Sequence, residues 1–304
     1  MTDRIVFFGA SVTQQKNGYA SHLSQRLGVD YKCFGHGGCH LMDDGICCID
    51  DVLKGPLKEP LKEPLKEPPT HCFIDYFSTA YTSENKHTLD CLDTILYKCT
   101  EVGCKTIWLF LPSGNHASRL SFYSFVKAHL DSKRATYLDL NEVLTYSTDL
   151  CRDIVHTTDQ GSIAYAEALY TLFLTVRESL PYPIEVSKTK YCDIQRLSVN
   201  QTVHTRLSLE GDCTIVAVSL TVGPSSGIVY IGSKKYTIWD VHCHYKRTSF
   251  HLRNIPVSGT ITIDVSQEPV DYSLCRRPDF DFGSPTKVLH VLDVYYIGAT
   301  LRLV

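Results

Sequence analysis

Short apolar runs alternate with helical stretches over residues 1–180. In the stretch at 89–99, for example, leucine, isoleucine and cysteine recur at helical spacing and would share one face of a helix. Strands that alternate with helices in this way form βαβ units, which build a parallel sheet covered by helices. The predicted strands are 4–8, 29–34, 71–77, 105–111 and 136–138, and the predicted helices are 19–27, 89–99, 120–130 and 162–177.

The pattern changes near Leu180-Pro181-Tyr182-Pro183, after which almost no helical periodicity remains. Alternating or β-branched runs follow, separated by turn sequences such as Gly223-Pro224-Ser225-Ser226-Gly227. Short strands at this spacing predict an antiparallel β-sandwich of about 120 residues. We therefore expect two domains, 1–180 and 181–304, with the boundary between residues 178 and 190. The predicted strands of the second domain are 213–222, 227–231, 236–239, 259–265 and 287–297.

One segment of the first domain, residues 53–69, interrupts the alternation. It reads Leu-Lys-Glu-Pro three times at 57–68, after a related copy, Leu53-Lys54-Gly55-Pro56. A proline at every fourth position excludes a helix and a central strand, and the alternating Lys and Glu keep the segment solvated. We interpret the segment as an exposed insertion whose length matters little, and a motif that binds a partner is the alternative.

Composition and charge are typical of a folded globular protein. Of the 304 residues, 43% are hydrophobic and 21% are charged, which excludes wholesale disorder. Lys and Arg total 30 against 33 Asp and Glu, and the net charge of −3 is too balanced for nucleic-acid binding through bulk charge. The sequence has no apolar run long enough for a membrane helix, and its first residues do not read as a signal peptide. We therefore expect a cytoplasmic protein without a transmembrane segment.

The 13 cysteines lack the regular spacing of a disulfide framework. In a reducing compartment most of them would be thiols in the core. Zinc is the alternative, suggested by His242-Cys243-His244, but the paired C-x-x-C ligands of a structural zinc site do not occur in the sequence. Asp43-Asp44 could suggest a cation site, but in a polar loop they would be solvated. We therefore predict no metal site.

Two segments of the first domain carry residues suited to nucleophilic catalysis. Ser11 follows the first predicted strand, and a turn into a helix there would expose its hydroxyl at the carboxyl edge of the sheet and aim backbone N–H groups at a reacting carbonyl. Asp153 and His156 precede the last helix at a spacing that can place the carboxylate beside the imidazole. A simple helix cap is the alternative for the serine turn, but the combination favours a triad of Ser11, His156 and Asp153.

With these segments the chain resembles the SGNH (GDSL-type) hydrolase superfamily. The first block of that family, Gly-Asp-Ser-x-Thr, matches Gly9-Ala10-Ser11-Val12-Thr13, with alanine in place of aspartate. The last block, Asp-x-x-His followed by a glycine, matches Asp153, His156 and Gly161. The resemblance covers residues 4–178 and implies a flavodoxin-like three-layer α/β/α sandwich with a parallel sheet.

The resemblance also implies an oxyanion hole, in which the sequence departs from the family. Gly38, in the glycine-rich stretch after the second strand, would give one backbone N–H. The third block of the family carries an asparagine donor, and Ala80 stands at that position here. Loss of such a donor costs about 2.7–4 kcal/mol of transition-state stabilisation unless another group replaces it. Ser78, Thr79 and Asn115 are the candidates for that replacement.

The resemblance implies acyl-ester chemistry through an acyl-Ser11 intermediate. The first expectation is O-acetyl transfer to a bacterial-type polysaccharide, with acetyl-CoA as the acyl donor and no bound cofactor. A carbohydrate acetylesterase with the same triad is the alternative, and an inactive module that binds a glycan or a protein is an alternative of another class. Aromatic residues of the β-rich domain would be core residues or a sugar-stacking platform; they are Tyr236, Trp239, Tyr245, Tyr295 and Tyr296.

Overall fold

The computed structural model describes residues 4–38, 40–54, 68–78, 83–277, 279–282 and 286–304. Residues 55–67, which hold most of the Leu-Lys-Glu-Pro repeat, lie outside this description. The chain forms two compact units, Met1–Cys192 and Asp193–Val304, and each is described by itself. No helix within the described ranges is long and apolar enough to span a membrane.

The sheet of the first unit has five parallel strands in the order β2-β1-β3-β4-β5. This is the flavodoxin-like order, so the predicted fold class is confirmed. All five residues of β1 and of β3 are buried, because helices cover both faces of a parallel sheet. The strands are β1 Ile5–Gly9, β2 Tyr31–Gly35, β3 His71–Asp75, β4 Lys105–Phe110 and β5 Thr136–Asp139.

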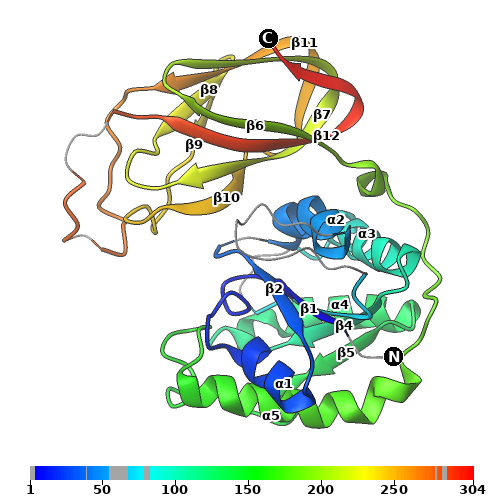
Figure 1. The fold of residues 1–304 in the computed structure, drawn as a ribbon. Coiled ribbons are helices and arrows are strands. Elements are labelled where there is room, and N and C mark those ends of the chain that lie inside the picture. The colour runs from blue at the N-terminus through cyan, green and yellow to red at the C-terminus, as the bar shows by residue number, and fades with distance from the viewer. Residues whose placement is uncertain (1–3, 39, 55–67, 79–82, 278, 283–285) are drawn as a thin grey trace. The chain divides into compact units, whose positions relative to one another are not determined.

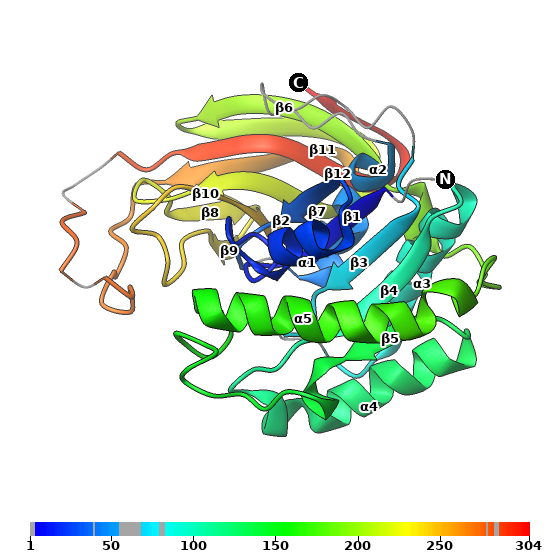
Figure 2. The same ribbon diagram turned by 60° about the horizontal axis from the view of Figure 1, so that its bottom comes forward.

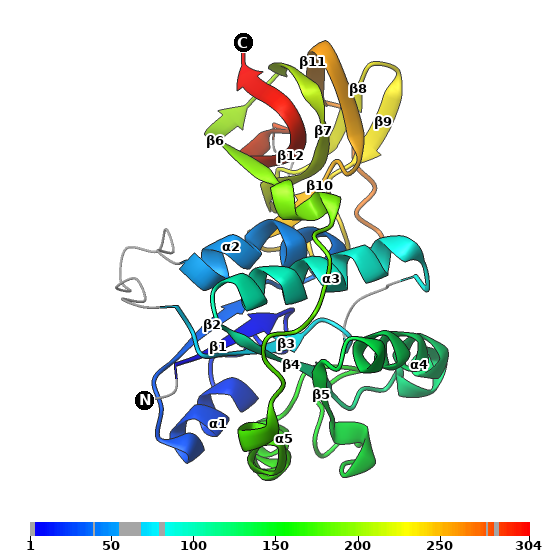
Figure 3. The same cartoon turned by 90° about the vertical axis from the view of Figure 1, so that its right-hand side faces the viewer.

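The described part of the first unit has five α-helices around this sheet, and α1 and α5 pack together on one face of it (Figures 2 and 3). Helices α2 and α3 lie on the opposite face (Figure 3). The α-helices are α1 Tyr19–Leu27, α2 Ile46–Lys54, α3 Lys86–Glu101, α4 His116–Ser132 and α5 Asp159–Val176. Short 3₁₀ helices occur at Leu140–Glu142, Arg177–Ser179 and Lys190–Asp193.

Strand β4 shows how the alternation of side chains builds two cores. Ile107 and Leu109 are buried with residues of α1 and α5. Trp108 and Phe110 point to the other face, where both rings stack on Phe77 at centroid distances of 5.6 and 4.9 Å. Phe122 of α4 meets Phe77 edge-on in the same cluster, which places α4 on this second face.

A π-helix at Leu41–Gly45 leads directly into α2, and the sequence analysis predicted neither element. The expectation that Asp43 and Asp44 are solvated is wrong, because their exposed fractions are only 1% and 0%. The carboxylate of Asp44 lies 2.8 Å from Nδ1 of His36 and accepts a hydrogen bond from the hydroxyl of Tyr76 at 2.5 Å. These partners compensate for the burial of the Asp44 carboxylate.

The first unit extends beyond the predicted boundary at residue 180. The hydroxyl of Thr189 lies 2.6 Å from the hydroxyl of Thr94, and the hydroxyl of Tyr191 lies 2.7 Å from Nδ1 of His87. Both partners belong to α3. The segment 181–192 is therefore held against a helix of the first unit.

The second unit is a seven-stranded antiparallel sheet, which agrees with the predicted antiparallel β architecture. One edge of the long strand β7 pairs with β12, while the other edge pairs first with β11 and then with β10. The strands therefore form one hydrogen-bonded sheet that divides along β7 (Figure 1). The strands are β6 Gln195–Val203, β7 Arg206–Val222, β8 Ile228–Ile231, β9 Lys234–Thr237, β10 Arg247–His251, β11 Ile255–Ser266 and β12 Leu289–Leu303.

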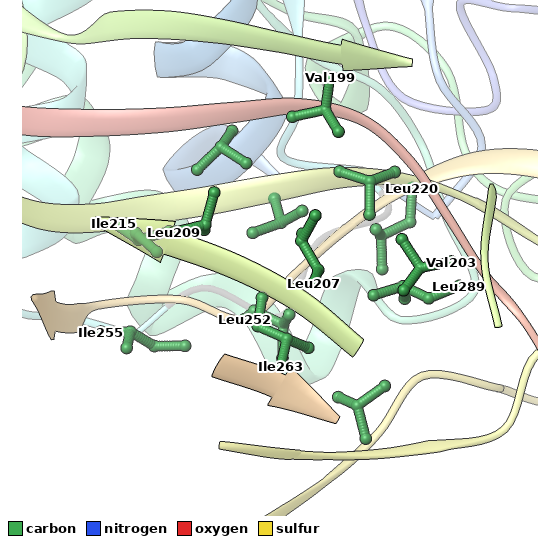
Figure 4. Packing of buried hydrophobic residues seen from close by; sticks show 14 of the residues in the cluster. Val199, Val203, Leu207, Leu209, Ile215, Leu220, Leu252, Ile255, Ile263 and Leu289 are labelled. Carbon is green, nitrogen blue, oxygen red and sulfur yellow. The ribbon is translucent and has the colours of Figure 1, made fainter. Parts of the chain in front are cut away.

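The core of the second unit consists of aliphatic residues that alternate along these strands, such as Leu207, Leu209 and Ile263 (Figure 4). Gly298 in β12 permits a close approach to β7, because a Cβ at this position would lie 2.6 Å from the Cα of Cys213. Its φ of 140° also suits only glycine. This core shares no residue with the core cluster that lines the α1 and α5 face of the first unit.

Candidate active site

Ser11 lies in a turn directly after β1, and its side chain is half-buried. The turn stays close to β3: the N–H of Ala10 donates to the backbone oxygen of Asp75 at 3.0 Å. A Cβ on Gly9 would lie 2.3 Å from that same oxygen, so glycine is required at this position. Helix α1 begins at Tyr19, the first residue of the predicted helix, so a short irregular segment separates the serine turn from the helix.

Asp153 and His156 lie in the loop before α5. Oδ1 of Asp153 accepts hydrogen bonds from the backbone N–H groups of Val155 and His156 at 2.9 and 2.8 Å. The hydroxyl of Thr158 caps α5 by accepting from the N–H of Gly161 at 3.0 Å. The short spacing of Asp-x-x-His thus forms a tight turn that brings carboxylate and imidazole together.

The structure brings Ser11, His156 and Asp153 into one chain of hydrogen bonds. Nδ1 of His156 lies 2.8 Å from Oδ2 of Asp153, and Nε2 lies 2.8 Å from Oγ of Ser11. Because an ionised carboxylate can only accept, Nδ1 carries the proton and Nε2 accepts from the serine hydroxyl. An imidazole in this tautomer can remove the serine proton during nucleophilic attack.

The Asp153 carboxylate is held in its ionised form. Partial burial opposes ionisation, but the backbone N–H groups of His156 and Val155, together with the His156 imidazole, keep the pKa of Asp153 below its usual value. The side chain of Asp153 remains 41% exposed, and that of His156 24%. The carboxylate and the imidazole are therefore partly open to solvent rather than enclosed.

Gln15 is a site residue that the sequence analysis missed. Its Nε2 donates to the backbone oxygen of Thr157 at 3.1 Å, and its Oε1 accepts from the N–H and the hydroxyl of Thr157 at 3.2 Å each. Thr157 directly follows His156. The side chain of Gln15 therefore connects the serine turn to the loop that carries the imidazole. A single glutamine belongs to no recognisable motif, so the sequence could not predict this contact.

The predicted oxyanion donor Gly38 lies in the loop after β2 with a φ of 74°, a conformation that favours glycine. The start of this loop is joined to the serine turn, because the N–H of His36 donates to the backbone oxygen of Gly9 at 3.2 Å. Gly37 lies beside the nucleophile: a Cβ built on it would be 3.9 Å from the Cβ of Ser11. The glycine-rich loop and the serine thus occupy the same edge of the sheet.

Ser78 lies at the end of the described segment after β3 and is 1% exposed. Its hydroxyl donates to Oδ1 of Asp75 at 2.6 Å, so this donor is directed into the protein rather than toward a ligand at Ser11. Thr79 and Ala80, the other predicted positions of this block, lie outside the described residues.

Asn115 precedes α4, and its side chain makes no cap hydrogen bond with the helix. The neighbouring Gly114 donates its N–H to the backbone oxygen of Ile154 at 2.7 Å, within the Asp153–His156 loop. The hydroxyl of Tyr146 donates to the backbone oxygen of Asp153 at 3.2 Å. The loop that carries Asn115 is therefore fastened to the loop that carries the base.

Within the described ranges, no group of three or more His, Cys, Asp or Glu side chains is placed to hold a metal ion. The cysteines described there are free thiols, and all but Cys33 are buried. Tyr295 and Tyr296 are also buried, so these two rings are core residues of the second unit and not an exposed platform for a sugar. Tyr245 is 47% exposed, and the ring of Trp239 packs edge-on against Tyr272.

A parallel sheet in this strand order is followed in the chain by an antiparallel β unit, and solved two-domain structures share this fold. The chain is similar to the crystal structure of a two-domain esterase (CEX) active on acetylated mannans, co-crystallised with mannopentaose. The TM-score is 0.66 at 11% identity, and the match covers 98% of this chain and 92% of that one. A second structure of a two-domain esterase (CEX) active on acetylated mannans gives a TM-score of 0.65 at 12% identity, with 99% and 92% coverage.

At these identities the likeness establishes the fold. No protein-family model matches the sequence, and no curated protein matches it either.

Proposed function

We propose that the protein is a serine-dependent esterase that removes acyl groups, acetyl above all, from an acylated carbohydrate. The observation that carries the proposal is the hydrogen-bonded chain from Ser11 Oγ through the His156 imidazole to Asp153, with both links at 2.8 Å. This arrangement supports nucleophilic attack on an ester carbonyl without a bound cofactor.

The reaction has two halves. Ser11 Oγ attacks the ester carbonyl carbon while Nε2 of His156 takes the hydroxyl proton, and the tetrahedral intermediate collapses by breaking the bond to the sugar oxygen. The imidazolium returns the proton to that oxygen, which leaves as the alcohol. Water then attacks the acyl-Ser11 carbonyl while His156 takes its proton, the bond to Ser11 Oγ breaks, and the imidazolium returns the proton to Oγ as the carboxylic acid is released.

The carbohydrate part of the proposal is supported by the two-domain neighbours, which are active on acetylated mannans and match nearly the whole of this chain. A catalytically inactive binding module is the alternative of another class. We disfavour this alternative because a chain of hydrogen bonds from a serine through an imidazole to a carboxylate, partly exposed at the edge of the sheet, is not needed for folding.

Acetyl transfer to a sugar hydroxyl, with acetyl-CoA as donor, uses the same acyl-Ser11 intermediate. The two activities differ only in the second nucleophile. The departure from the family block at Ala80 is the feature in favour of transfer.

One experiment separates these possibilities. The protein and Ser11→Ala are incubated with acetylated manno-oligosaccharides, and in parallel with acetyl-CoA and the deacetylated sugars, and acetyl groups are followed by mass spectrometry. We expect loss of acetyl groups in the first incubation with the wild type only. Acetyl gain in the second would assign a transferase, and equal turnover by Ser11→Ala would refute the serine mechanism.

A further inference from the structure

Asp75, the last residue of β3, is a fully buried carboxylate beneath the serine turn. The hydroxyl of Thr13 donates to Oδ2 of Asp75 at 3.2 Å, and the hydroxyl of Ser78 donates to Oδ1 at 2.6 Å. Thr13 belongs to the same turn as Ser11. Asp75 thus joins the nucleophile turn to the segment that follows β3.

The remaining groups around this carboxylate come from three helices. Tyr19 of α1 shares a hydrogen bond of 2.9 Å with Thr13, and its pKa is raised by burial and then by the charge of Asp75. From α4, Arg119 donates to the backbone oxygen of Phe77 at 2.6 Å and favours the charged form of Asp75. Tyr123 of α4 and Tyr165 of α5 also feel this charge, and burial is the largest cause of the raised pKa of each.

None of the ion pairs among the described residues involves the Asp75 carboxylate. The positive charge of Arg119 acts on it without forming a salt bridge. Burial raises the pKa of Asp75 to about 6, and the hydrogen bonds from the hydroxyls of Ser78 and Thr13 and from the backbone N–H of Ser78, together with the charge of Arg119, offset only part of this effect. A buried carboxylate whose pKa stays raised is unfavourable for folding in its charged form. Its location, one hydrogen bond away from the nucleophile turn, suggests a role in the reaction.

We propose that Asp75 is a positioning residue that holds the Ser11 turn and the segment after β3 in the reactive arrangement, and that it does so only as the carboxylate. This inference rests on the proposed serine mechanism. The ionised group accepts from Thr13 and Ser78 at once. The protonated group must donate one hydrogen bond, so one of the two hydroxyls has to reverse and the link between the two segments weakens.

The inference is tested by the pH dependence of kcat/KM for p-nitrophenyl acetate in wild type and Asp75→Asn. Asp75 titrates only in the wild type, so the ratio of the wild-type kcat/KM to that of Asp75→Asn should rise as the pH is raised through about 6. The other titrating groups are common to both proteins and cancel in this ratio. Because the serine would be misplaced in Asp75→Asn, the kcat of this variant should be about tenfold to a hundredfold lower than that of the wild type at pH 8.

The matched control is Asp93→Asn, which removes a carboxylate that pairs with His129 at 2.7 Å in the same unit and contacts none of the site residues described above. It should keep the wild-type pH profile. A ratio of the wild-type kcat/KM to that of folded Asp75→Asn that does not change with pH would overturn the inference.

Ser78→Ala and Thr13→Val provide a second test in case Asp75→Asn does not fold. Each removes a hydrogen bond to the charged form, so the pKa of Asp75 should rise and the acid limb should move to higher pH. An acid limb that stays in place in both folded variants would also overturn the inference. Failure of the proposed function is distinct from these outcomes, because it would appear as undiminished turnover by Ser11→Ala.

Discussion

Gln15 and Thr157 are joined by three hydrogen bonds, although 142 residues separate them in the chain. One residue is in the serine turn and the other directly follows His156. The amide of Gln15 donates and accepts at the same time, so it fixes both the distance and the orientation of the two segments. The link therefore joins the turn of Ser11 to the residue next to His156, and Ser11 Oγ lies 2.8 Å from His156 Nε2.

Replacement of Gln15 by alanine should therefore lower kcat more than it changes KM. The serine and the imidazole would remain, but their alignment would loosen, and a loss of about tenfold to a hundredfold is expected. Steady-state kinetics with p-nitrophenyl acetate measures the effect. Gln25→Ala, on the exposed surface of α1, is the matched control and should behave like the wild type. An unchanged kcat for Gln15→Ala would show that the two segments are aligned by other contacts.

Substitution within the Ser11–His156–Asp153 chain should abolish turnover without unfolding the protein. Ser11→Ala and His156→Ala remove the nucleophile and the base, and Asp153→Asn favours the wrong imidazole tautomer, so kcat should fall on the order of 10³-fold or more. Ser11 is half-buried and loses one hydroxyl, so the melting temperature should stay within a few degrees of the wild type. Covalent labelling by a fluorophosphonate gives an independent measurement: the wild type should be modified at Ser11, and Ser11→Ala should not react.

Asp75 should make the protein less stable at neutral than at acid pH, relative to Asp75→Asn. The pKa of this carboxyl is about 6 in the folded protein against an ordinary value of 3.8, so the folded state binds the proton more tightly. The ionised carboxylate therefore does not destabilise the folded state below pH 3.8, and it destabilises the folded state fully above about pH 6. The free energy of unfolding of Asp75→Asn minus that of the wild type should therefore rise by about 2–3 kcal/mol between pH 4 and pH 7.5.

Urea denaturation of both proteins at the two pH values measures this difference. All other titrating groups are common to both proteins and cancel in the comparison. A difference that is the same at pH 4 and pH 7.5 would mean that Asp75 has an ordinary pKa. Higher stability and lower activity of Asp75→Asn at neutral pH would together show that the carboxylate is kept for function at a cost in stability.

The parts of the molecule that local pattern could predict are those with a strong period or a short motif. The helix predicted at 19–27 occurs at Tyr19–Leu27, and all five strands of the parallel sheet lie within a few residues of their predicted positions. The proximity of Asp153 and His156 could be predicted because only two residues separate them in the loop before the last helix. Ser11 could be placed at the same edge because parallel strands share a carboxyl end.

The parts that were missed depend on contacts between distant segments. Because Asp44 is polar, we predicted that it lies in a solvated loop, but in the structure it is buried with His36 and Tyr76 inside the first unit. Gln15 and Asp75 form hydrogen bonds with residues that no spacing rule connects to them. In the second unit, β6 and β10 were missed because polar residues outnumber apolar ones in both, which weakens the strand pattern.

The Leu-Lys-Glu-Pro repeats should be dispensable. Deletion of two of the three copies at 57–68 shortens the connection between α2 and β3, and even doubling a loop costs only about 0.6 kcal/mol of closure entropy. Esterase activity and melting temperature should therefore remain close to those of the wild type. A fall of many degrees in the melting temperature would show that the repeats pack against the protein and would favour the alternative of a binding motif.

The last prediction concerns the end of the first unit. Residues 1–192 should fold alone, because the core on the α1 and α5 face is separate from that of the β unit, and they should hydrolyse p-nitrophenyl acetate. A shorter chain, residues 1–180, loses the buried side chains of Ile184 and Tyr191 and the hydrogen bonds of Thr189 and Tyr191 to α3.

Burial of two such side chains is worth about 3–5 kcal/mol, so residues 1–180 should melt roughly 10 °C below residues 1–192. Circular dichroism measures both melting curves, and p-nitrophenyl acetate hydrolysis at a temperature where both chains are folded compares their sites. Because the 181–192 segment contacts α3 and none of Ser11, His156 or Asp153, the two folded chains should have the same kcat. Equal melting temperatures would place the end of the folding unit at residue 180, and a lower kcat in the folded shorter chain would show that the segment also supports the site.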